Sequence, residues 1–542
     1  MMMVCAGVST AQAQVPLDRA DPTITARQLP ADPAETPAAT PEVAVPAAPA
    51  VDRIADRVTG PLRAVSIEGR EQLPATAFAD VIREAVGRRM TKAGLGDLAN
   101  AVGGIARARG YPFATASIAA QAVQDGILRV TLDLGRVDAV RVIGATNAQA
   151  DRLLAERLVT GRGVRLRELE AALLLVGDIP GVRVTDSRYT RQNGFGILLV
   201  TIATDRAQAY AQVDNRGSRE VGPIRSTMLA SLRGVAGAGD ELAAIVSQTP
   251  LQPSEFIFVR GRYSAPVDRR GSTLSASLSV GRSHPGGALA ALDVVGNSVD
   301  VAATYTRPLL RTRNNSLWAQ LEFRALSSDQ TLSGIMLRRD RLAMASASIN
   351  GVHRLAGGTL RSELNGVVGL PLAGSTRSGQ ALASRFDGDS RFVTASYLLD
   401  WSAPLAGPFS VALASAGQIA SRPLLATAEI GLGGPVFGRG YDYAERTGDK
   451  GIMGAAEVRA DLGRVAPGIV SRWQTYGFLD AGRVSNLRGG TGGGSLVSTG
   501  IGMRIGRGKV DGMVEAAFPL NADRFDTRDR SPRISARLSV AF

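Results

Sequence analysis

The chain has 542 residues, of which 45% are hydrophobic, 20% charged and 5% aromatic, so it is too long for one small domain and too apolar for a disordered protein. Its formal net charge is +13, but the basic residues are spread from Arg19 to Arg537 and do not cluster with aromatic residues, so we do not expect it to bind nucleic acid. A single cysteine, Cys5, excludes a disulfide framework and a cysteine-based zinc site, and we expect no metal and no other cofactor.

Residues 1–14 are predicted to be a signal peptide, because an apolar stretch is followed by Ala11-x-Ala13, the small-residue spacing of a signal-peptidase site. The first basic residue is Arg19, so the basic start of such a signal is missing and we expect the signal to be truncated. Residues 15–60 are rich in alanine and proline, which is typical of an extended linker. Within them, Pro16 to Gln28 has room for at most a short helical segment.

An internal repeat follows. Each copy opens with a short alternating strand that stops at a glycine, Val65–Gly69 in the first copy and Val140–Gly144 in the second. Each copy closes on a similar strand, Gly126–Leu132 and Gly196–Ile202, which share five of their seven residues. The helices predicted between these strands are residues 77–86 and 95–109, then 148–158 and 166–176. Each copy is therefore predicted to be a β-α-α-β-β unit, small enough to be one domain.

The last two strands of such a unit can pair beside the first, which leaves a strand at the edge of the sheet. An extended peptide can bind there as an added strand, through main-chain hydrogen bonds that depend little on side chains. We expect such edge strands to bind the substrate. The alternative is that the two copies are spacers without a ligand.

The first copy contains Gly110-Tyr111-x-x-Ala114 and then Asp125-Gly126-x-Leu128, and this pattern resembles polypeptide-transport-associated (POTRA) domains. Two such domains in tandem, at residues 61–137 and 138–205, resemble the periplasmic arm of the two-partner secretion transporters. The resemblance implies that the rest of the chain is an outer-membrane barrel.

Residues 206–542 repeat one pattern, in which about ten residues of alternating polarity are followed by Gly, Asn, Asp or Pro. In the final segment, apolar residues at alternate positions from Ile534 to Phe542 are separated by Ser535, Arg537 and Ser539. This alternation is typical of a barrel strand with lipid on one side and the lumen on the other, and a soluble sandwich rarely reaches this length. At roughly 20 residues per strand and connection, the region predicts about 16 strands.

The hydropathy of the chain agrees with such a barrel. The mean hydropathy is +0.05, and no run of about 18 uncharged apolar residues predicts a membrane helix. Alternating strands average to neutral hydropathy, so a membrane barrel is not excluded. The predicted fold class is thus two α+β periplasmic POTRA domains followed by a transmembrane antiparallel β-barrel.

The segment Phe437-Gly438-Arg439-Gly440-Tyr441-Asp442 resembles the pore-loop tip of the outer-membrane assembly and secretion superfamily. The resemblance implies a long extracellular loop that folds back into the pore and pairs its arginine with a strand aspartate in a Phe-x-Asp context, here Phe478-Leu479-Asp480. Two departures are a glycine, Gly438, in front of the arginine, and the lack of a strong signal in Pro16 to Gln28 for the pore-plugging helix of some relatives.

The residues themselves support this pairing. Tyr476, Phe478 and Asp480 share one face of the predicted strand 473–484, and two aromatic side chains beside an acid suit a site that packs an inserted loop. The guanidinium of Arg439 can offer two parallel hydrogen bonds to the Asp480 carboxylate.

The resemblance implies a transporter in the outer membrane of a Gram-negative bacterium that moves an unfolded partner exoprotein, such as an adhesin or haemolysin, from the periplasm to the surface. We expect a monomer whose barrel contacts outer-membrane lipid and lipopolysaccharide. The alternative is a factor that inserts other barrels into the membrane. An enzyme is not expected, because a pair such as Ser348 and His353 needs a third orienting group, and no zinc-protease, P-loop or nucleophile-elbow motif is present.

Overall fold

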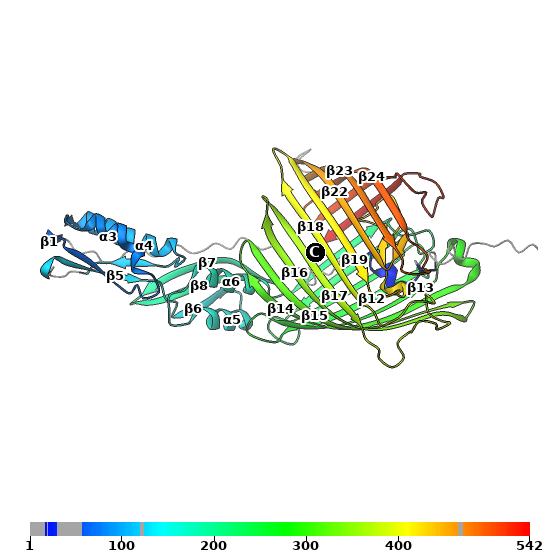
Figure 1. The fold of residues 1–542 in the computed structure, drawn as a ribbon, viewed down its shortest axis with the longest axis horizontal. Helices are drawn as coiled ribbons and strands as arrows, with labels where there is room; N and C mark the ends of the chain where they lie inside the picture. The colour runs from blue at the N-terminus through cyan, green and yellow to red at the C-terminus, as the bar shows by residue number, and fades with distance from the viewer. Residues whose placement is uncertain (1–16, 19, 30–56, 120–123, 464–469) are drawn as a thin grey trace, which may run out of the picture.

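The computed structural model describes residues 17–18, 20–29, 57–119, 124–463 and 470–542. The predicted signal peptide, residues 1–14, lies outside these residues, as does most of the linker. Two small α+β units stand in a row and lead to one end of a β-barrel (Figure 1). The predicted fold class is confirmed.

The first unit has a three-stranded sheet in the order β2-β5-β4, with β2 parallel to β5. Its elements are β1 (Arg57–Pro61), β2 (Ala64–Glu68), η1 (Ala75–Phe78), α3 (Ala79–Ala85), β3 (Arg89–Thr91), α4 (Lys92–Ala108), β4 (Thr115–Ser117), η2 (Gln124–Gly126) and β5 (Ile127–Asp133). Helix α4 begins three residues before the prediction because the Thr91 side chain caps it, accepting a hydrogen bond from Gly94 N at 3.2 Å. The β1–β3 pair was not predicted, since Gly60-Pro61 is typical of a turn.

The second unit repeats the order strand, two helices, two strands. Its elements are β6 (Ala139–Gly144), α5 (Ala148–Leu158), α6 (Leu166–Gly177), β7 (Val182–Gln192) and β8 (Phe195–Thr204). Asn147 caps α5 by accepting hydrogen bonds from Gln149 N and Ala150 N, both at 3.0 Å. The last strand, β8, lies between β6 and β7 and runs parallel to β6, so each unit has two edge strands instead of one.

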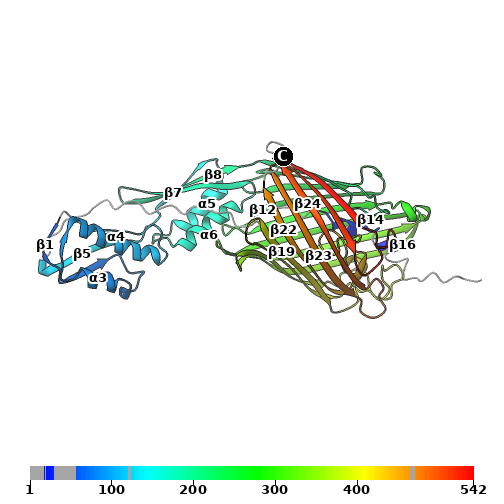
Figure 2. The same cartoon turned by 90° about the horizontal axis from the view of Figure 1, so that it is seen from above.

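The two units are joined by side-chain contacts. The rings of Phe113 and Tyr189 stack with centroids 4.0 Å apart and planes 7° apart. Arg191 on β7 forms an ion pair with Asp133 and donates a hydrogen bond to Thr115 Oγ1 at 3.3 Å. The β7–β8 hairpin therefore reaches onto β4, an edge strand of the first unit (Figure 2).

Among the described residues, 16 antiparallel strands form a closed barrel, in which β26 pairs with β9. The strands are β9 (Ala207–Asp214), β10 (Arg225–Arg233), β11 (Glu241–Gln248), β12 (Phe256–Pro266), β13 (Thr273–Ser283), β14 (Val294–Arg311), β15 (Asn315–Leu332), β16 (Ile335–Leu355), β17 (Gly358–Gly369), β18 (Val393–Pro404), β19 (Phe409–Ala420), β22 (Lys450–Gly463), β23 (Arg472–Ser485), β24 (Gly494–Arg507), β25 (Val510–Pro519) and β26 (Arg533–Ala541). On β26, Ile534 and Leu538 are exposed and Ser535 is buried, as the alternation predicted. Within the described residues, no helix has the length and apolarity needed to cross a membrane.

The barrel contacts the second unit at one end. Arg311 Nε donates to Asp178 Oδ2 at 2.8 Å, and Gln149 Nε2 donates to the carbonyl of Asp268 at 3.4 Å. Because neighbouring strands are antiparallel, their connections alternate between the two ends. The connections at the opposite end include residues 370–392, 421–449 and 486–493. We call residues 421–449 the lumen loop; it contains η4 (Ala426–Ala428), β20 (Ile430–Leu432) and β21 (Arg446–Gly448).

Phe113→Ala should loosen the junction between the two units, because it removes the stack with Tyr189 and a side chain that is buried in the second unit's core. The expected destabilisation is about 3–5 kcal/mol. In the full-length protein, hydrogen–deuterium exchange of β7 should become faster. Phe195→Ala, at an exposed position on the same hairpin, is the control. Unchanged exchange in Phe113→Ala would contradict the proposed coupling.

Candidate functional site in the barrel lumen

The tip of the lumen loop is a tight turn built on glycines. Gly438 has a φ of +76°, a conformation that side chains disfavour, and Tyr441 N donates to the carbonyl of Gly438 at 3.0 Å. A Cβ on Gly440 would lie 3.1 Å from Pro519 N and from Ser498 Cβ. The glycine in front of the arginine, a departure from the family pattern, thus allows the turn that presents the arginine to the wall.

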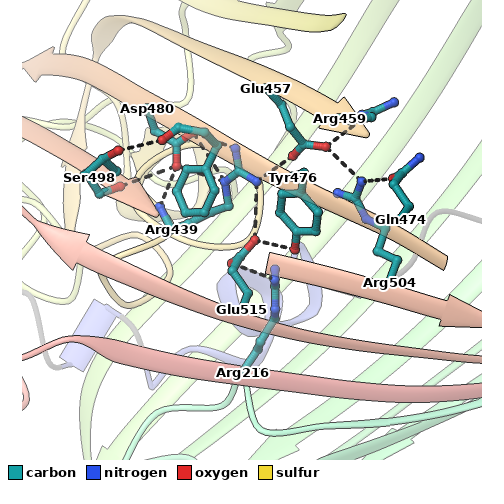
Figure 3. Close-up of polar contacts among 12 residues, drawn as sticks. Arg216, Arg439, Glu457, Arg459, Gln474, Tyr476, Asp480, Ser498, Arg504 and Glu515 are labelled. Carbon is teal, nitrogen blue, oxygen red and sulfur yellow. Dashed lines mark hydrogen bonds and ion pairs between the residues drawn. The ribbon is translucent and has the colours of Figure 1, made fainter. Parts of the chain in front are cut away.

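Arg439 and Asp480 are brought together (Figure 3). Arg439 Nη2 donates to Asp480 Oδ1 at 3.0 Å, and Nε donates to Oδ2 at 3.0 Å, which gives two parallel hydrogen bonds. The backbone N–H of Arg439 also donates to Oδ2 at 3.0 Å. Asp480 is fully buried on β23, so both the side chain and the backbone of the tip are fixed to the wall at one carboxylate.

Two further carboxylates face the same guanidinium from two other strands of the wall. Arg439 Nη1 donates to Glu457 Oε2 on β22 at 2.8 Å and to Glu515 Oε2 on β25 at 3.3 Å. Its Cζ lies 3.5 Å from the centroid of the Phe478 ring. Burial opposes the charge of Arg439, but the carboxylates outweigh burial, so its pKa is raised above the ordinary value.

The carboxylates are balanced by other arginines, which extends the contacts into a network. Arg459 and Arg504 both donate to Glu457 Oε1, at 2.6 and 2.8 Å. Arg216 donates to Glu515 Oε1 at 3.2 Å, and the Tyr476 hydroxyl donates to the other oxygen of Glu515 at 2.9 Å. Four guanidinium groups thus share three carboxylates (Figure 3).

The two aromatic residues of β23 lie flat over glycines of β24. In the pairing of these strands, Phe478 is opposite Gly500 and Tyr476 is opposite Gly502. A Cβ on Gly500 would lie 2.4 Å from the Phe478 ring, and a Cβ on Gly502 would lie 2.3 Å from the Tyr476 ring. Both glycines therefore provide the space in which the rings support the bound arginines.

The remaining tip residues contact other parts of the wall. Tyr441 is fully buried, and its hydroxyl lies 3.1 Å from Asn521 Oδ1. Asp442 forms an ion pair with Arg533 on β26. Phe437 packs against an apolar cluster that includes Leu432. The tip is held by polar contacts on several strands and by one small apolar cluster.

Glu457, Glu515, Arg504 and Arg216 were not identified as site residues from the sequence. Alternation places Glu457 on the lumen face, but Arg439 could be assigned to it only after the strand pairing was known. Glu515 likewise alternates with apolar neighbours. The sequence therefore showed only that each acid lies on the lumen face. That position does not identify the residue to which the acid binds.

The amino-terminal segment occupies the lumen beside this loop, as the dark-blue ribbon within the barrel indicates (Figures 1 and 2). Its described residues, 17–18 and 20–29, include α2 (Pro22–Ala26), which begins at the capping residue Asp21. Strands of the wall hold it: Gln330 donates to the carbonyl of Leu17 at 2.8 Å, and Arg338 forms an ion pair with Asp18. The sequence left open whether a helix plugs the pore, and the structure places this short helix in the lumen.

The amino-terminal segment also contacts the lumen loop. Arg27 donates to the carbonyl of Glu429 at 3.0 Å and to the carbonyl of Thr427. Ile24 packs against Ala426 and Ala444 of the loop. The segment and the loop therefore occupy the lumen as one assembly.

Ser348 and His353 do not form a nucleophile and base. They are an odd number of positions apart on β16, so they lie on opposite faces of the strand. His353 Nδ1 lies 3.1 Å from Asn315 Oδ1, and Ser348 Oγ donates to Gln320 Oε1 at 3.3 Å.

Comparison with known proteins gives the family. The family model described as haemolysin secretion/activation protein ShlB/FhaC/HecB matches residues 196–505, more than half of the chain. The chain belongs to this family of two-partner secretion transporters. The model described as POTRA domain, ShlB-type, matches residues 61–135. The predicted family and its transport class are confirmed.

Individual relatives agree with this assignment. The transporter is similar to the heme/hemopexin transporter protein HuxB of Haemophilus influenzae strain 86-028NP, with 24% identity over 430 residues, which cover 77% of this chain and 76% of HuxB. Its fold is similar to CdiB from Escherichia coli, with a TM-score of 0.72, 18% identity and 100% of both chains covered. It is also similar to BamA from Haemophilus ducreyi lacking POTRA domains 1–3, with a TM-score of 0.54, 13% identity and 90% of this chain and 100% of that chain covered.

The family locates this transporter in the outer membrane, with POTRA domains in the periplasm. The predicted location is thereby confirmed. The barrel end that contacts the second unit is therefore the periplasmic end. The lumen loop starts and ends at the opposite, cell-surface end, and its tip reaches back into the barrel.

The seating of the amino-terminal segment should strengthen as the pH falls. Burial raises the pKa of Asp18 from 3.8 to about 6, against the effect of Arg338 and with that of Asp21 and Asp340. A released segment has an ordinary carboxyl pKa, so the seated form binds the proton more tightly. Between about pH 7.5 and about pH 5, the ratio of seated to released segment should rise about ten-fold.

This dependence can be measured as the open fraction of single channels in planar bilayers, which should be lower at the lower pH. Asp18→Asn should lose the part of the dependence, about ten-fold, that Asp18 contributes, because an amide does not titrate there. Glu429, whose pKa burial raises to about 7, acts in the same direction, so some dependence should remain. An equal pH dependence in Asp18→Asn and the unchanged protein would contradict the assignment.

Proposed function

We propose that this transporter moves an unfolded partner exoprotein, of the adhesin or haemolysin class, from the periplasm through the barrel to the cell surface. The observation that carries the proposal is the filling of the lumen. The loop and the amino-terminal segment are held there mainly by hydrogen bonds and ion pairs, which water or a passing chain can replace. Family membership supports the same function.

The chain is proposed to act without chemistry of its own. No nucleotide-binding motif is present in the sequence, so we propose that folding of the exported protein outside the cell drives the movement. We propose that it is not an enzyme, and that it works as a monomer in contact with outer-membrane lipid and lipopolysaccharide. The proposed domain limits are 61–137, 138–205 and 206–542.

The POTRA edge strands are proposed to capture the partner in extended form, and β6 is the best candidate in the second unit. Edge strand β4 is partly covered, because Arg191 bonds to Thr115 on it. Edge strand β7 is irregular between Val184 and Asp186, and irregular, charged edges resist strand addition. On β6 the apolar Ile143 is exposed. Among the described residues, the edge of β6 that faces away from β8 has no backbone hydrogen bond.

The tip of the lumen loop is proposed to hold the conducting geometry of the pore. Arg439 joins the loop to three strands of the wall, on which Glu457, Asp480 and Glu515 lie. This fixed point allows the rest of the loop to move while the tip and the wall stay together.

Insertion of other barrels into the membrane is the second candidate function. The structural likeness to BamA favours it, because the two chains share the barrel and the preceding units. Two periplasmic units favour secretion. Deleting the gene should abolish release of one large exoprotein into the medium and leave other barrel proteins at normal levels. Loss of several barrel proteins with normal release of the exoprotein would favour insertion.

Arg439→Ala should reduce secretion of the partner by about ten-fold or more, because it leaves the buried Asp480 without its cation and removes one of the cations that balance Glu457 and Glu515. The barrel itself should still fold, as measured by its heat-modifiable mobility in gels. Arg439→Lys should be intermediate, since one ammonium cannot reach all three acids at once. Arg530→Ala, at an exposed surface-end arginine, is the control. Normal secretion in Arg439→Ala would count against the role of the tip.

A further inference from the structure

A second buried arginine holds the other end of the lumen loop. Arg385 lies in the connection 370–392 between β17 and β18, and 5% of its surface is exposed. Its Nη1 donates to Asp449 Oδ1 at 2.9 Å and Oδ2 at 2.8 Å, and to Glu429 Oε1 at 3.0 Å. Asp449 is fully buried and directly precedes β22, so it marks the base of the lumen loop.

The same guanidinium joins a third connection. Its Nη2 donates to the carbonyl of Leu487 at 2.6 Å, in the connection 486–493 between β23 and β24. Asp449 accepts from Leu487 N at 2.6 Å and from Leu424 N at 2.7 Å. Three surface-end connections therefore meet at the Arg385–Asp449 pair, and their contacts reinforce one another.

The glycine-rich stretch 489–494 makes space for this contact. A Cβ on Gly490 would lie 2.4 Å from Arg385 Nη2 and 2.5 Å from its Cζ. Gly492 accepts a hydrogen bond from Thr447 N at 3.2 Å, so the stretch also contacts the lumen loop. The stretch is therefore packed closely around the guanidinium.

We propose that Arg385 is a positioning residue that holds the base of the lumen loop and keeps the surface end of the barrel closed. Arg439 anchors the tip to the middle of the wall. Arg385, 54 positions earlier in the chain, anchors the base through a separate set of carboxylates. With only one anchor the loop can turn about it; with both, it spans the lumen in one position. This inference rests on the proposed transport function.

The amino-terminal segment is connected to this contact through one residue. Glu429 accepts from Arg385 with its side chain and from Arg27 with its carbonyl. Displacement of the lumen-loop base therefore disturbs the segment that fills the lumen. Loss of Arg385 should loosen both the base of the lumen loop and the amino-terminal segment, whereas Arg27→Ala should loosen only the segment.

The test is the open fraction of purified full-length protein in planar lipid bilayers. Arg385→Ala should raise the open fraction about ten-fold, because the buried Asp449 loses its cation and the loop base is released. Arg385→Lys should give a smaller rise, since one ammonium cannot bond to Asp449, Glu429 and Leu487 together. The control is Arg391→Ala, an exposed arginine in the same connection, which should not change the open fraction.

Two further variants address the same contact from the other side. Gly490→Ala should raise the open fraction, because its Cβ displaces the guanidinium. Asp449→Ala combined with Arg385→Ala should give less opening than the sum of the two single effects, since the two residues share one contact. If Arg385→Ala fails to fold by gel mobility, Gly490→Ala and Arg385→Lys carry the test. Open fractions equal to that of Arg391→Ala in all these variants would overturn the proposal.

This test is separate from that of transport. Channel conductance needs no secreted partner, so the position of the loop is measured even if the chain inserts barrels instead of secreting a protein. Conversely, normal closure by Arg385 with no effect of gene deletion on any exoprotein would contradict the proposed function and leave the role of Arg385 intact.

Discussion

The site depends on the need to balance a guanidinium that is buried inside the barrel. Removing a charge from water costs several kcal/mol unless partners replace the lost hydration. Arg439 meets this requirement with Asp480, Glu457 and Glu515, and these acids must then be balanced in turn by other arginines. One residue on a loop tip therefore imposes charged residues on several strands and fixes which strands must be neighbours.

This requirement also explains how a filled lumen is compatible with transport. If apolar side chains filled the lumen, they would pack as a continuous core. Opening the lumen would then expose them to water at a large cost in free energy. The loop and the amino-terminal segment instead meet the wall through groups that can bond equally well to water. Contacts such as Arg27 with Glu429 can therefore open locally, while the wall keeps its strand pairing.

Local pattern was sufficient to predict much of the fold. Helix α5 was predicted at its observed limits because its cap, its apolar spacing and its end all lie within twelve residues, 147–158. The alternation of Ile534 to Phe542 likewise identified a barrel strand by itself. The resemblance of the tip motif located Arg439 and Asp480, which strand periodicity could not have paired.

What could not be predicted depends on register and on distant contacts. Glu515 and Arg504 lie on neighbouring strands, β25 and β24, and their approach to the same site follows from strand order and stagger, which alternation does not specify. The seating of residues 17–18 and 20–29 depends on groups such as Arg338, more than three hundred positions away. Arg385 gave no signal either, because its partners belong to two other connections.

Three glycines, Gly490, Gly500 and Gly502, are explained by crowding around these charges. Gly500 and Gly502 leave room for the rings of Phe478 and Tyr476, and Gly490 leaves room for a guanidinium. Since a planar ring or guanidinium needs a flat surface within about 4 Å, a side chain at these positions would push it away from its partners. Gly490, Gly500 and Gly502 therefore each lie where a flat charged or aromatic group approaches the backbone. Gly500 and Gly502 are thus part of the site, because they make room for the rings over which Arg439 and Arg504 lie.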